Sequence, residues 1–387
     1  MTRLLAFFLM RSVSYVGGAE RRFESLATAL PHFGVEFVVL AYSEDAPFLK
    51  VSPRFLISRA SPHKYVRLIL AGTKAVRAAK CDAVYAYHSD FIRVLIPSYV
   101  VSLLCRKPFV VVVHDDTKRA QDSRSMLGLL RLELTNGKGT HVLRRLTEFS
   151  NQVIRRLGVR SAAACICVSK FAMTYAEGTL RAKHPSLSGN GVGDDWFATS
   201  PVEKRFDAVF VGRVSALKGV YSLITAWKKV VARFENAKLL IIGPATPEDV
   251  KKVKSLIDHL EISRAVTVKG FVQDDKELRT LMSSSRIFVL PSRREGFGLA
   301  VAEAMAAGLP CVLSDIPAFV QTFGNAALLV PVDDSDALAR GILSLLEDPI
   351  AAGVLAERGQ ELARSMKWEH VAAREATIIK ATLPKSP

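Results

Sequence analysis

Residues 287–310 combine a short apolar run, a glycine-containing loop and a run of helix-forming residues. The apolar residues 287–290 end at Pro291 and predict a buried strand that stops there. Residues 299–307 are rich in Ala, Leu, Met and Glu and stop at Gly308, so they predict a helix. A strand, a tight loop and a helix in this order are the repeating unit of α/β domains.

The loop of this unit is suited to bind an anion beside a sugar. The backbone N–H groups of Gly298 and Leu299 lie where a helix begins, and the helix dipole favours negative charge there. Glu295 lies in the loop and Glu303 about one turn inside the helix, and carboxylates accept hydrogen bonds from sugar hydroxyls. Phosphate and sugar side by side suggest a nucleotide sugar. The alternative is a plain strand–helix unit with two solvated glutamates.

The chain is 387 residues long, and strands alternate with helical patterns through both halves. In the first half, apolar runs predict strands at 4–10, 36–41, 83–87, 109–113 and 162–168. In the second half, they predict strands at 207–212, 238–243, 266–269, 287–290, 311–314 and 327–330. This alternation predicts an α/β protein of two doubly wound parallel-sheet domains. The Gly- and Ser-rich stretch 186–193 predicts the crossing between an N-terminal domain, 1–190, and a C-terminal domain, 191–367.

The positive charge is concentrated in the first half. The chain has a net charge of +16, and residues 1–200 account for +13 of it, with 28 Lys and Arg against 15 Asp and Glu. This excess predicts an anionic partner for the N-terminal domain: a membrane surface, nucleic acid or a phosphorylated substrate. No aromatic residues are interleaved with the basic ones as a stacking platform for nucleic-acid bases would need.

Residues 118–160 mix many of these cations with leucines, a composition typical of a helix at a membrane interface. We expect this segment to dock on anionic lipid through cations that include Arg144, Arg145, Arg155 and Arg156. The alternative is an ordinary half-buried helix with its leucines in the core and its arginines solvated.

Cysteines and apolar runs indicate a reduced cytoplasmic protein. The five cysteines are scattered, and their odd number argues against a disulfide framework. No run approaches the roughly 20 apolar residues of a membrane-spanning helix. Residues 4–10 could form a short signal-peptide core, but a first buried strand explains them better. We therefore expect a cytoplasmic protein that is peripheral at the inner face of the membrane.

Two further turns place ligand-binding groups after strands. Arg213 and Lys218 follow the first strand of the second domain, where two cations can neutralise a departing diphosphate. Two surface cations of a basic protein are the alternative. Gly17 and Gly18 form a turn between a strand and a helix, where the backbone can approach a ligand closely. Because the turn is not GxGxxG, the usual dinucleotide fingerprint is unsupported.

Two histidines follow strands of the first domain. His114 comes directly after the strand 109–113, and His88 follows the strand 83–87. Ligands of open α/β sheets bind at the carboxyl ends of the strands, so both side chains are candidates to contact a substrate. Their alternative role is that of polar residues satisfied at strand ends.

The segment 291–315, PSRREGFGLAVAEAMAAGLPCVLSD, resembles the retaining glycosyltransferases of family 4, whose E-x7-E motif matches Glu295 and Glu303. GR-x4-KG at 212–219 is a second hallmark of that family. The resemblance covers nearly the whole chain and is strongest over about 205–335. It implies the GT-B fold: two Rossmann-like domains face each other across a cleft, and a terminal helix, about 368–387, packs back on the first domain. Gly193 departs from the family, since many members have Asp there.

The resemblance also implies roles for individual residues. Glu295 approaches the donor sugar, with Gly296, Phe297, Gly298 and Leu299 in the same loop, and Glu303 binds the ribose. Arg213 and Lys218 bind the diphosphate, with Gly17 and Gly18 above the phosphates. The backbone around Phe271 and Val272 reads the nucleobase. His114 lies near the reacting sugar and the acceptor, and His88 is a weaker acceptor-site candidate.

We therefore expect a retaining glycosyltransferase that moves a sugar from a nucleoside diphosphate to a hydroxyl of a lipid-linked glycan or glycolipid. No cofactor or metal is expected, because none of the acidic pairs 115–116, 194–195 and 274–275 is a D-x-D at a strand end and the two cations already supply charge. A nucleotide-sugar epimerase or phosphorylase of the same architecture is one alternative. A non-enzymatic basic scaffold that binds nucleic acid is the other.

Overall fold

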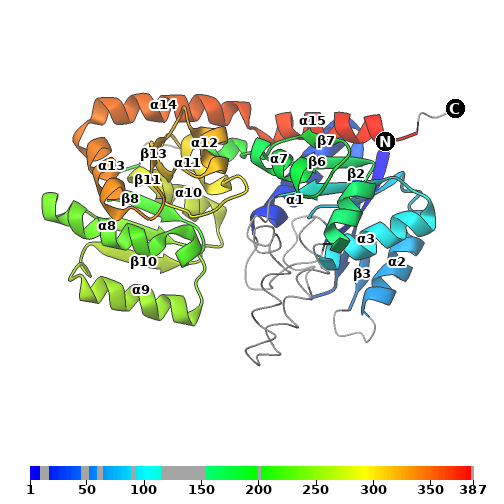
Figure 1. Cartoon of the computed structure of the whole chain (residues 1–387), viewed down its shortest axis with the longest axis horizontal. Coiled ribbons are helices and arrows are strands. Elements are labelled where there is room, and N and C mark those ends of the chain that lie inside the picture. Colours follow the sequence, from blue (N-terminus) through cyan, green and yellow to red (C-terminus); the bar gives the residue numbers. More distant parts are fainter. Residues whose placement is uncertain are drawn as a thin grey trace, which may run out of the picture. The chain divides into compact units, whose positions relative to one another are not determined.

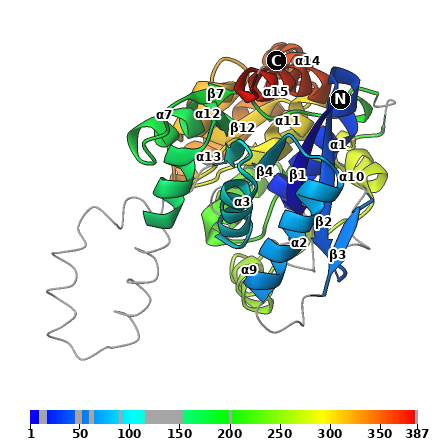
Figure 2. The ribbon, with the colours of Figure 1, turned by 90° about the vertical axis from the view of Figure 1, so that its right-hand side faces the viewer.

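The computed structural model describes residues 1–8, 17–44, 52–58, 64–88, 92–114, 153–198 and 202–384. These residues form two compact units, Met1–Gly189 with Val371–Pro387 and Asn190–His370. Each unit contains one parallel sheet with helices packed against it (Figures 1 and 2). The predicted class, α/β with two doubly wound parallel sheets, is confirmed.

The sheet of the first unit has the strand order β3-β2-β1-β4-β5-β6-β7, and all its pairs are parallel. The strands are β1 (Thr2–Phe8), β2 (Val35–Tyr42), β3 (Phe55–Ile57), β4 (Ala83–Ala86), β5 (Phe109–Val113), β6 (Ala164–Cys167) and β7 (Pro185–Leu187). The central strands β4, β5 and β6 are buried along their whole length, as their continuous apolar sequences require.

Helices of the first unit pack against both faces of this sheet. They are α1 (Gly18–Ala29), η1 (Leu30–Phe33), α2 (Lys64–Ala78), α3 (Ile92–Cys105), a helix over 153–161, α7 (Lys170–Gly178) and α15 (Trp368–Thr382). Gly72 lets α2 approach closely, because a Cβ there would lie 2.5 Å from Phe7 of β1 and 3.0 Å from Val101 of α3.

A buried polar network joins α15 to the first sheet. The Arg22 guanidinium of α1 forms an ion pair with Glu375 of α15 and donates to Ser188 Oγ at 2.8 Å. The Tyr85 hydroxyl of β4 donates to the same carboxylate at 2.5 Å. Burial, together with the Glu375 charge, raises the pKa of Tyr85 well above its ordinary value, so the phenol remains a donor. The Arg22 and Glu375 side chains are no more than 1% exposed.

The sheet of the second unit has the order β10-β9-β8-β11-β12-β13. Its strands are β8 (Phe206–Val211), β9 (Leu239–Ile242), β10 (Val266–Gly270), β11 (Ser285–Leu290), β12 (Cys311–Ser314) and β13 (Leu328–Val330). The helical segments are η4 (Asp194–Trp196), η5 (Ala216–Lys218), α8 (Val220–Arg233), α9 (Pro247–His259), α10 (Asp275–Ser283), α11 (Leu299–Ala306), α12 (Pro317–Phe323), α13 (Ser335–Glu347) and α14 (Pro349–Ser365). Because β8 and β11 are neighbours, the loops that follow them meet at the carboxyl edge.

The structure corrects one part of the predicted membrane-docking segment. Arg155 is buried, with 4% of its surface exposed. Its Nη1 donates to the Tyr175 hydroxyl at 2.9 Å, and its guanidinium carbon lies 5.0 Å from the centre of that ring. Arg155 therefore packs the helix 153–161 against α7 and is not a lipid-contacting cation. Arg144 and Arg145 lie outside the described residues, as does the whole of 118–152.

Candidate active site

The loops after β8 and β11 are held together at a glycine. Gly219 has a φ of +73°, and a Cβ there would lie 1.9 Å from the carbonyl oxygen of Pro291. Beside it, the Arg293 N–H donates to the Leu217 carbonyl at 2.9 Å. The absent side chain at 219 thus allows the two loops to touch, and the touching loops carry Lys218 and Glu295.

Lys218 and Glu295 form an ion pair between these loops. The ammonium contacts Glu295 Oε1, and the Ser292 hydroxyl donates to the same oxygen at 3.0 Å. The Lys218 side chain is 24% exposed and that of Glu295 11%, so the pair is partly screened from water. Arg213 is exposed on the loop that carries Lys218. The structure thus places a cation suited to a phosphate next to a carboxylate suited to a sugar hydroxyl.

The rest of the glycine loop leads into α11. Gly298 is the N-cap of α11, with a φ of +100°, and a Cβ there would lie 2.7 Å from the Phe319 ring. Leu299 begins the helix and Glu303 is buried in it. Gly296 is half-buried, whereas Phe297 is buried with its ring 5.5 Å from that of Phe323. Phe297 therefore packs the loop onto the domain.

The predicted base-reading turn follows β10. Gly270 ends that strand with a φ of +80°, and Phe271 next to it is 41% exposed. Val272 is buried. A partly exposed ring beside a turn of this kind can stack on a flat ligand.

In the first unit, the two candidate histidines lie together. His88 and His114 follow the paired strands β4 and β5, and their rings stack with centroids 4.8 Å apart at 29°. Nε2 of His114 lies 2.9 Å from the Tyr87 carbonyl oxygen. Because a carbonyl oxygen only accepts, this contact requires a proton on Nε2, which then donates to Tyr87.

Gly17 is the N-cap of α1, and Gly18 is the first residue of that helix. The nearly buried Glu20 carboxylate turns back over this end, since a Cβ on Gly17 would lie 2.7 Å from Glu20 Oε2. A carboxylate is stabilised at a helix N-terminus for the same reason as a phosphate. The N-terminus of α1 thus carries a negative group of its own.

Sequence reasoning missed Glu20 and Ser292. Glu20 stands three residues after the N-cap, which is the capping-box position of a Glu and was a readable signal. Ser292 stands three residues before Glu295 and is completely buried. The sequence signal for Ser292 is weak: it is a hydroxyl residue in the same loop as the carboxylate of Glu295. Within the described residues, no group of three or more His, Cys, Asp or Glu side chains is arranged to hold a metal ion.

Two family descriptions match consecutive parts of the chain. Glycosyltransferase Family 4 matches residues 16–195, and Glycosyl transferases group 1 matches residues 194–362. The chain belongs to the family 4 glycosyltransferases. One curated relative of this family 4 glycosyltransferase is the phosphatidyl-myo-inositol mannosyltransferase of Mycolicibacterium smegmatis, 34% identical over 196 residues, which are 48% of this chain and 49% of the relative. The chain thus spans about half the length of the curated relatives it matches.

Solved structures resemble this family 4 glycosyltransferase over its full length. HepE of Anabaena in complex with UDP and glucose has a TM-score of 0.76 at 20% identity, covering 98% of this chain and 100% of that one. Sucrose-phosphate synthase of Thermosynechococcus elongatus has a TM-score of 0.74 at 19% identity, covering 98% and 99%. At these identities the likeness shows the fold alone, and the predicted GT-B fold is confirmed.

The glycine between the loops gives a first testable prediction. Gly219→Ala should lower the free energy of unfolding by about 2–3 kcal/mol, because the new Cβ clashes with backbone and strains a left-handed residue. It should also weaken donor binding, since it pushes the Lys218 and Glu295 loops apart. Urea unfolding and donor titration measure the two effects. Gly353→Ala in α14 meets open space and should leave both unchanged or slightly stabilise the helix. Equal behaviour of the two variants would contradict the role given to Gly219.

Proposed function

We propose that the chain is a retaining, metal-independent glycosyltransferase that takes a sugar from a nucleoside diphosphate donor. The observation that carries this proposal is the Lys218–Glu295 pair, braced by Ser292. A donor brings a diphosphate for the cation and sugar hydroxyls for the carboxylate, so it can replace each half of the pair with a ligand contact. In the structure the two groups neutralise each other.

The proposed reaction breaks the bond between the sugar C1 and the diphosphate oxygen. The acceptor oxygen forms its bond to C1 on the same face, and its proton passes to a donor phosphate oxygen. Lys218 and Arg213 stabilise the negative charge that develops on the leaving diphosphate, and one such group is typically worth about 3 kcal/mol. Glu295 orients the sugar, and Glu303 binds the ribose. The turn at Phe271 and Val272 contacts the base, and the loop Gly296, Gly298 and Leu299 offers N–H groups to the donor.

The first unit supplies the remaining groups in this proposal. His114 lies beside the acceptor hydroxyl, and its Nε2 contact with the Tyr87 carbonyl oxygen fixes the position of the ring. His88, stacked on it, fixes the plane of its ring and faces the acceptor. Gly17 and Gly18 approach the donor phosphates, for which Glu20 must give up part of the α1 N-terminus.

We further propose a lipid-linked glycan or glycolipid as acceptor, reached at the cytoplasmic face of a membrane. The matched relative from Mycolicibacterium smegmatis is described as acting on phosphatidyl-myo-inositol, and residues 1–200 of this chain carry the basic excess that an anionic membrane attracts. Among the described residues, no helix is both long and apolar enough to cross a bilayer.

A panel of nucleoside diphosphate sugars tests the proposed function. A donor that binds only the folded protein raises its stability by RT ln(1 + [L]/Kd). The melting temperature should therefore rise with one nucleoside diphosphate sugar of the panel and not with the others. With that donor, an acceptor glycolipid should gain a sugar of unchanged anomeric configuration. Conversion of the nucleotide sugar without any acceptor-dependent product would favour the epimerase alternative. Nucleic-acid binding without any response to donors would favour the scaffold.

Transfer should persist in EDTA, because Lys218 and Arg213 supply the positive charge that a metal supplies elsewhere. The acidic pairs of the second unit are otherwise engaged: Asp194 pairs with Lys367 at 2.7 Å, and Asp274 caps α10. Residues 115–116 lie outside the described residues. Initial rates with and without EDTA should agree within error. Full loss of activity that Mg²⁺ or Mn²⁺ restores would contradict metal independence.

A further inference from the structure

A cavity of about 450 Å³ opens where α2 and α3 end. It is lined by the last turns of both helices and by the residues that lead into β4 and β5: Val76, Arg77, Lys80, Cys81, Asp82, Leu104, Cys105, Arg106 and Lys107. These residues precede β4 and β5, whereas His88 and His114 follow them. The cavity therefore lies at the opposite edge of the sheet from the candidate active site of this unit.

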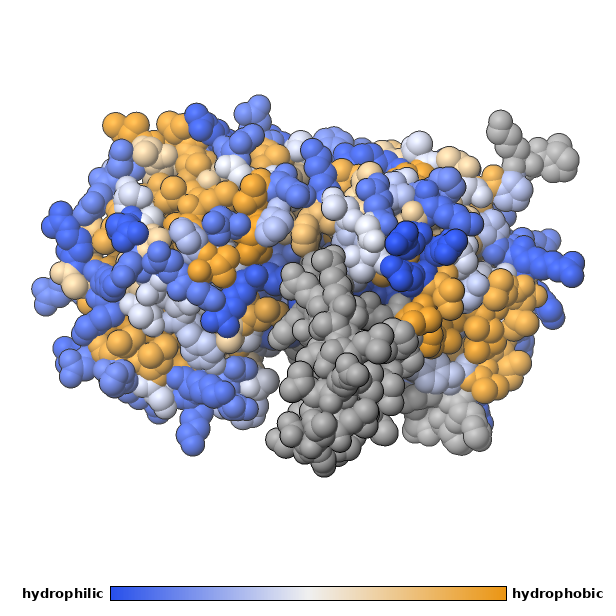
Figure 3. Space-filling model, viewed as in Figure 1, coloured by the Kyte–Doolittle hydropathy of each residue, from blue (hydrophilic) through white to orange (hydrophobic). Residues whose placement is uncertain are grey.

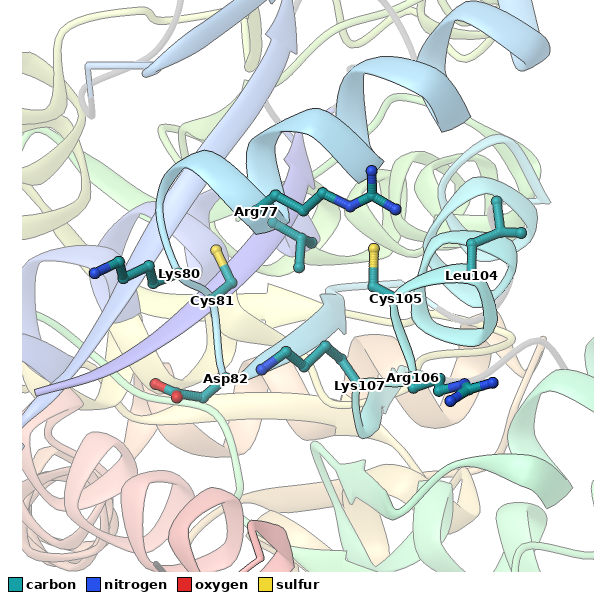
Figure 4. A pocket seen from close by; sticks show the side chains of 9 residues that line it. Arg77, Lys80, Cys81, Asp82, Leu104, Cys105, Arg106 and Lys107 are labelled. Carbon is teal, nitrogen blue, oxygen red and sulfur yellow. The ribbon is translucent and has the colours of Figure 1, made fainter.

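Four cations surround this cavity, and they face one carboxylate. Arg77, Lys80, Arg106 and Lys107 form no ion pair with any residue that the structure describes. The one acid, Asp82, is turned to the backbone, where its Oδ2 accepts from the Arg3 N–H at 2.8 Å. Figure 4 shows Arg77 and Lys107 extending above and below the two cysteine thiols. Unneutralised cations around a concave site attract an anion, and arginine pairs bidentately with phosphate oxygens.

Exposed aliphatic side chains lie on the same two helices. Leu103 and Leu104 are 58% and 59% exposed at the end of α3, and Leu104 also lines the cavity. On α2, Val66 and Leu70 are 56% and 64% exposed, and Leu70 stands seven residues before Arg77, on the same side of the helix. Figure 3 shows a continuous apolar area over α2 and α3. Water-facing leucines beside unpaired cations are the composition of a surface that rests on a charged bilayer.

We propose that the cavity binds the phosphate of an anionic phospholipid while the aliphatic side chains of α2 and α3 contact its acyl region. This site gives the proposed membrane location a definite docking surface, and it rests on that part of the proposed function. A bilayer lying along α2 and α3 runs parallel to the sheet, because both helices lie flat against it (Figures 1 and 2). The carboxyl edge with His88 and His114 is then beside the membrane rather than turned away from it.

Cys105 reports directly on this cavity. All five cysteines lie in the described residues, and the other four are buried whereas Cys105 is partly exposed. Burial raises the pKa of the neighbouring Cys81 thiol to about 11, which keeps it unreactive. Iodoacetamide should therefore alkylate Cys105 first, and mass spectrometry gives the rate. Vesicles of phosphatidylglycerol should slow this alkylation severalfold, whereas phosphatidylcholine vesicles should leave it unchanged.

A charge-removal variant and a matched control complete the test. Arg77→Gln with Lys107→Gln should weaken vesicle binding about 30-fold, since each cation near an anionic surface contributes about fivefold. The same double change at the exposed Lys251 and Lys254 of α9, in the other unit, should keep both vesicle binding and Cys105 protection. Donor binding in the absence of lipid should be unchanged in both variants, which separates failure of docking from failure of the proposed transferase.

Two results would overturn the proposal. Equal alkylation rates with and without anionic vesicles would show that lipid does not occupy the cavity. Protection by millimolar glycerol 3-phosphate that equals protection by vesicles would assign the cavity to a soluble phosphorylated ligand instead.

Discussion

Replacing Lys218 by alanine should lower the rate of sugar transfer about 100-fold at saturating donor, because it removes a charge that stabilises the departing diphosphate. The fold should survive, since Lys218 is the last residue of the short 3-10 helix η5 and its side chain is 24% exposed. Ser292 still holds Glu295 in this variant, so the sugar-binding carboxylate keeps one of its two partners. Initial rates and melting temperatures measure the two expectations separately.

Arg213→Ala should lower turnover by a similar factor, as Arg213 lies on the same loop and is exposed. Lys228→Ala is the matched control, because Lys228 is an exposed cation on the following helix, α8. Its transfer rate should equal that of the unmodified protein. Wild-type turnover in both Lys218→Ala and Arg213→Ala would contradict the proposal that this loop binds the donor diphosphate.

Removal of the Glu375 side chain should destabilise the first unit by about 3–5 kcal/mol, the usual loss when one partner of a buried ion pair is deleted. In Glu375→Ala, the Arg22 guanidinium stays in a site that water does not reach, without its carboxylate. The Tyr85 hydroxyl loses its acceptor as well. Urea unfolding followed by circular dichroism should show an earlier first transition.

Glu369→Ala is the control for this change, since it removes an exposed carboxylate from the same helix. Its free energy of unfolding should change by less than about 0.5 kcal/mol, as is usual for substitutions at the surface. The double variant Arg22→Met with Glu375→Leu should recover part of the lost stability, because it leaves no uncompensated charge. If Glu375→Ala were as stable as Glu369→Ala, the ion pair between Arg22 and Glu375 would contribute nothing to the stability of the first unit.

Strong local patterns predicted most of the fold. The apolar run 287–290 and the helix formers 299–307 correspond to β11 and α11, and the all-apolar 109–113 is β5. In each of these segments, the flanking residues are consistent with the helix or strand that the pattern predicts. By contrast, α14 was missed: half of its apolar residues are alanines and few of its residues are buried, so no periodic face marks it. The short edge strand β7, Pro185–Leu187, overlaps the start of the stretch 186–193 that was interpreted as the crossing.

Site residues were predictable where a motif carried them and invisible where only tertiary contacts do. Glu295 and Lys218 stand in recognisable loops, although their ion pair depends on β8 and β11 being neighbours. Arg155 resembled its exposed basic neighbours because charge along a helix does not reveal which cation has an aromatic partner. The cations at the ends of α2 and α3 form two pairs about thirty positions apart, Arg77 with Lys80 and Arg106 with Lys107, and only the sheet order brings the two pairs to one cavity.

The buried pair between Arg22 and Glu375 has a consequence for how the protein is made. The two residues are 353 positions apart. At the usual ~5–20 residues per second, the ribosome completes Arg22 roughly 20 to 70 s before it completes Glu375. Throughout that interval the nascent first unit holds a guanidinium without its carboxylate, while the whole of Asn190–His370 is synthesised and can fold. The domain that is translated first is thus the last to be finished.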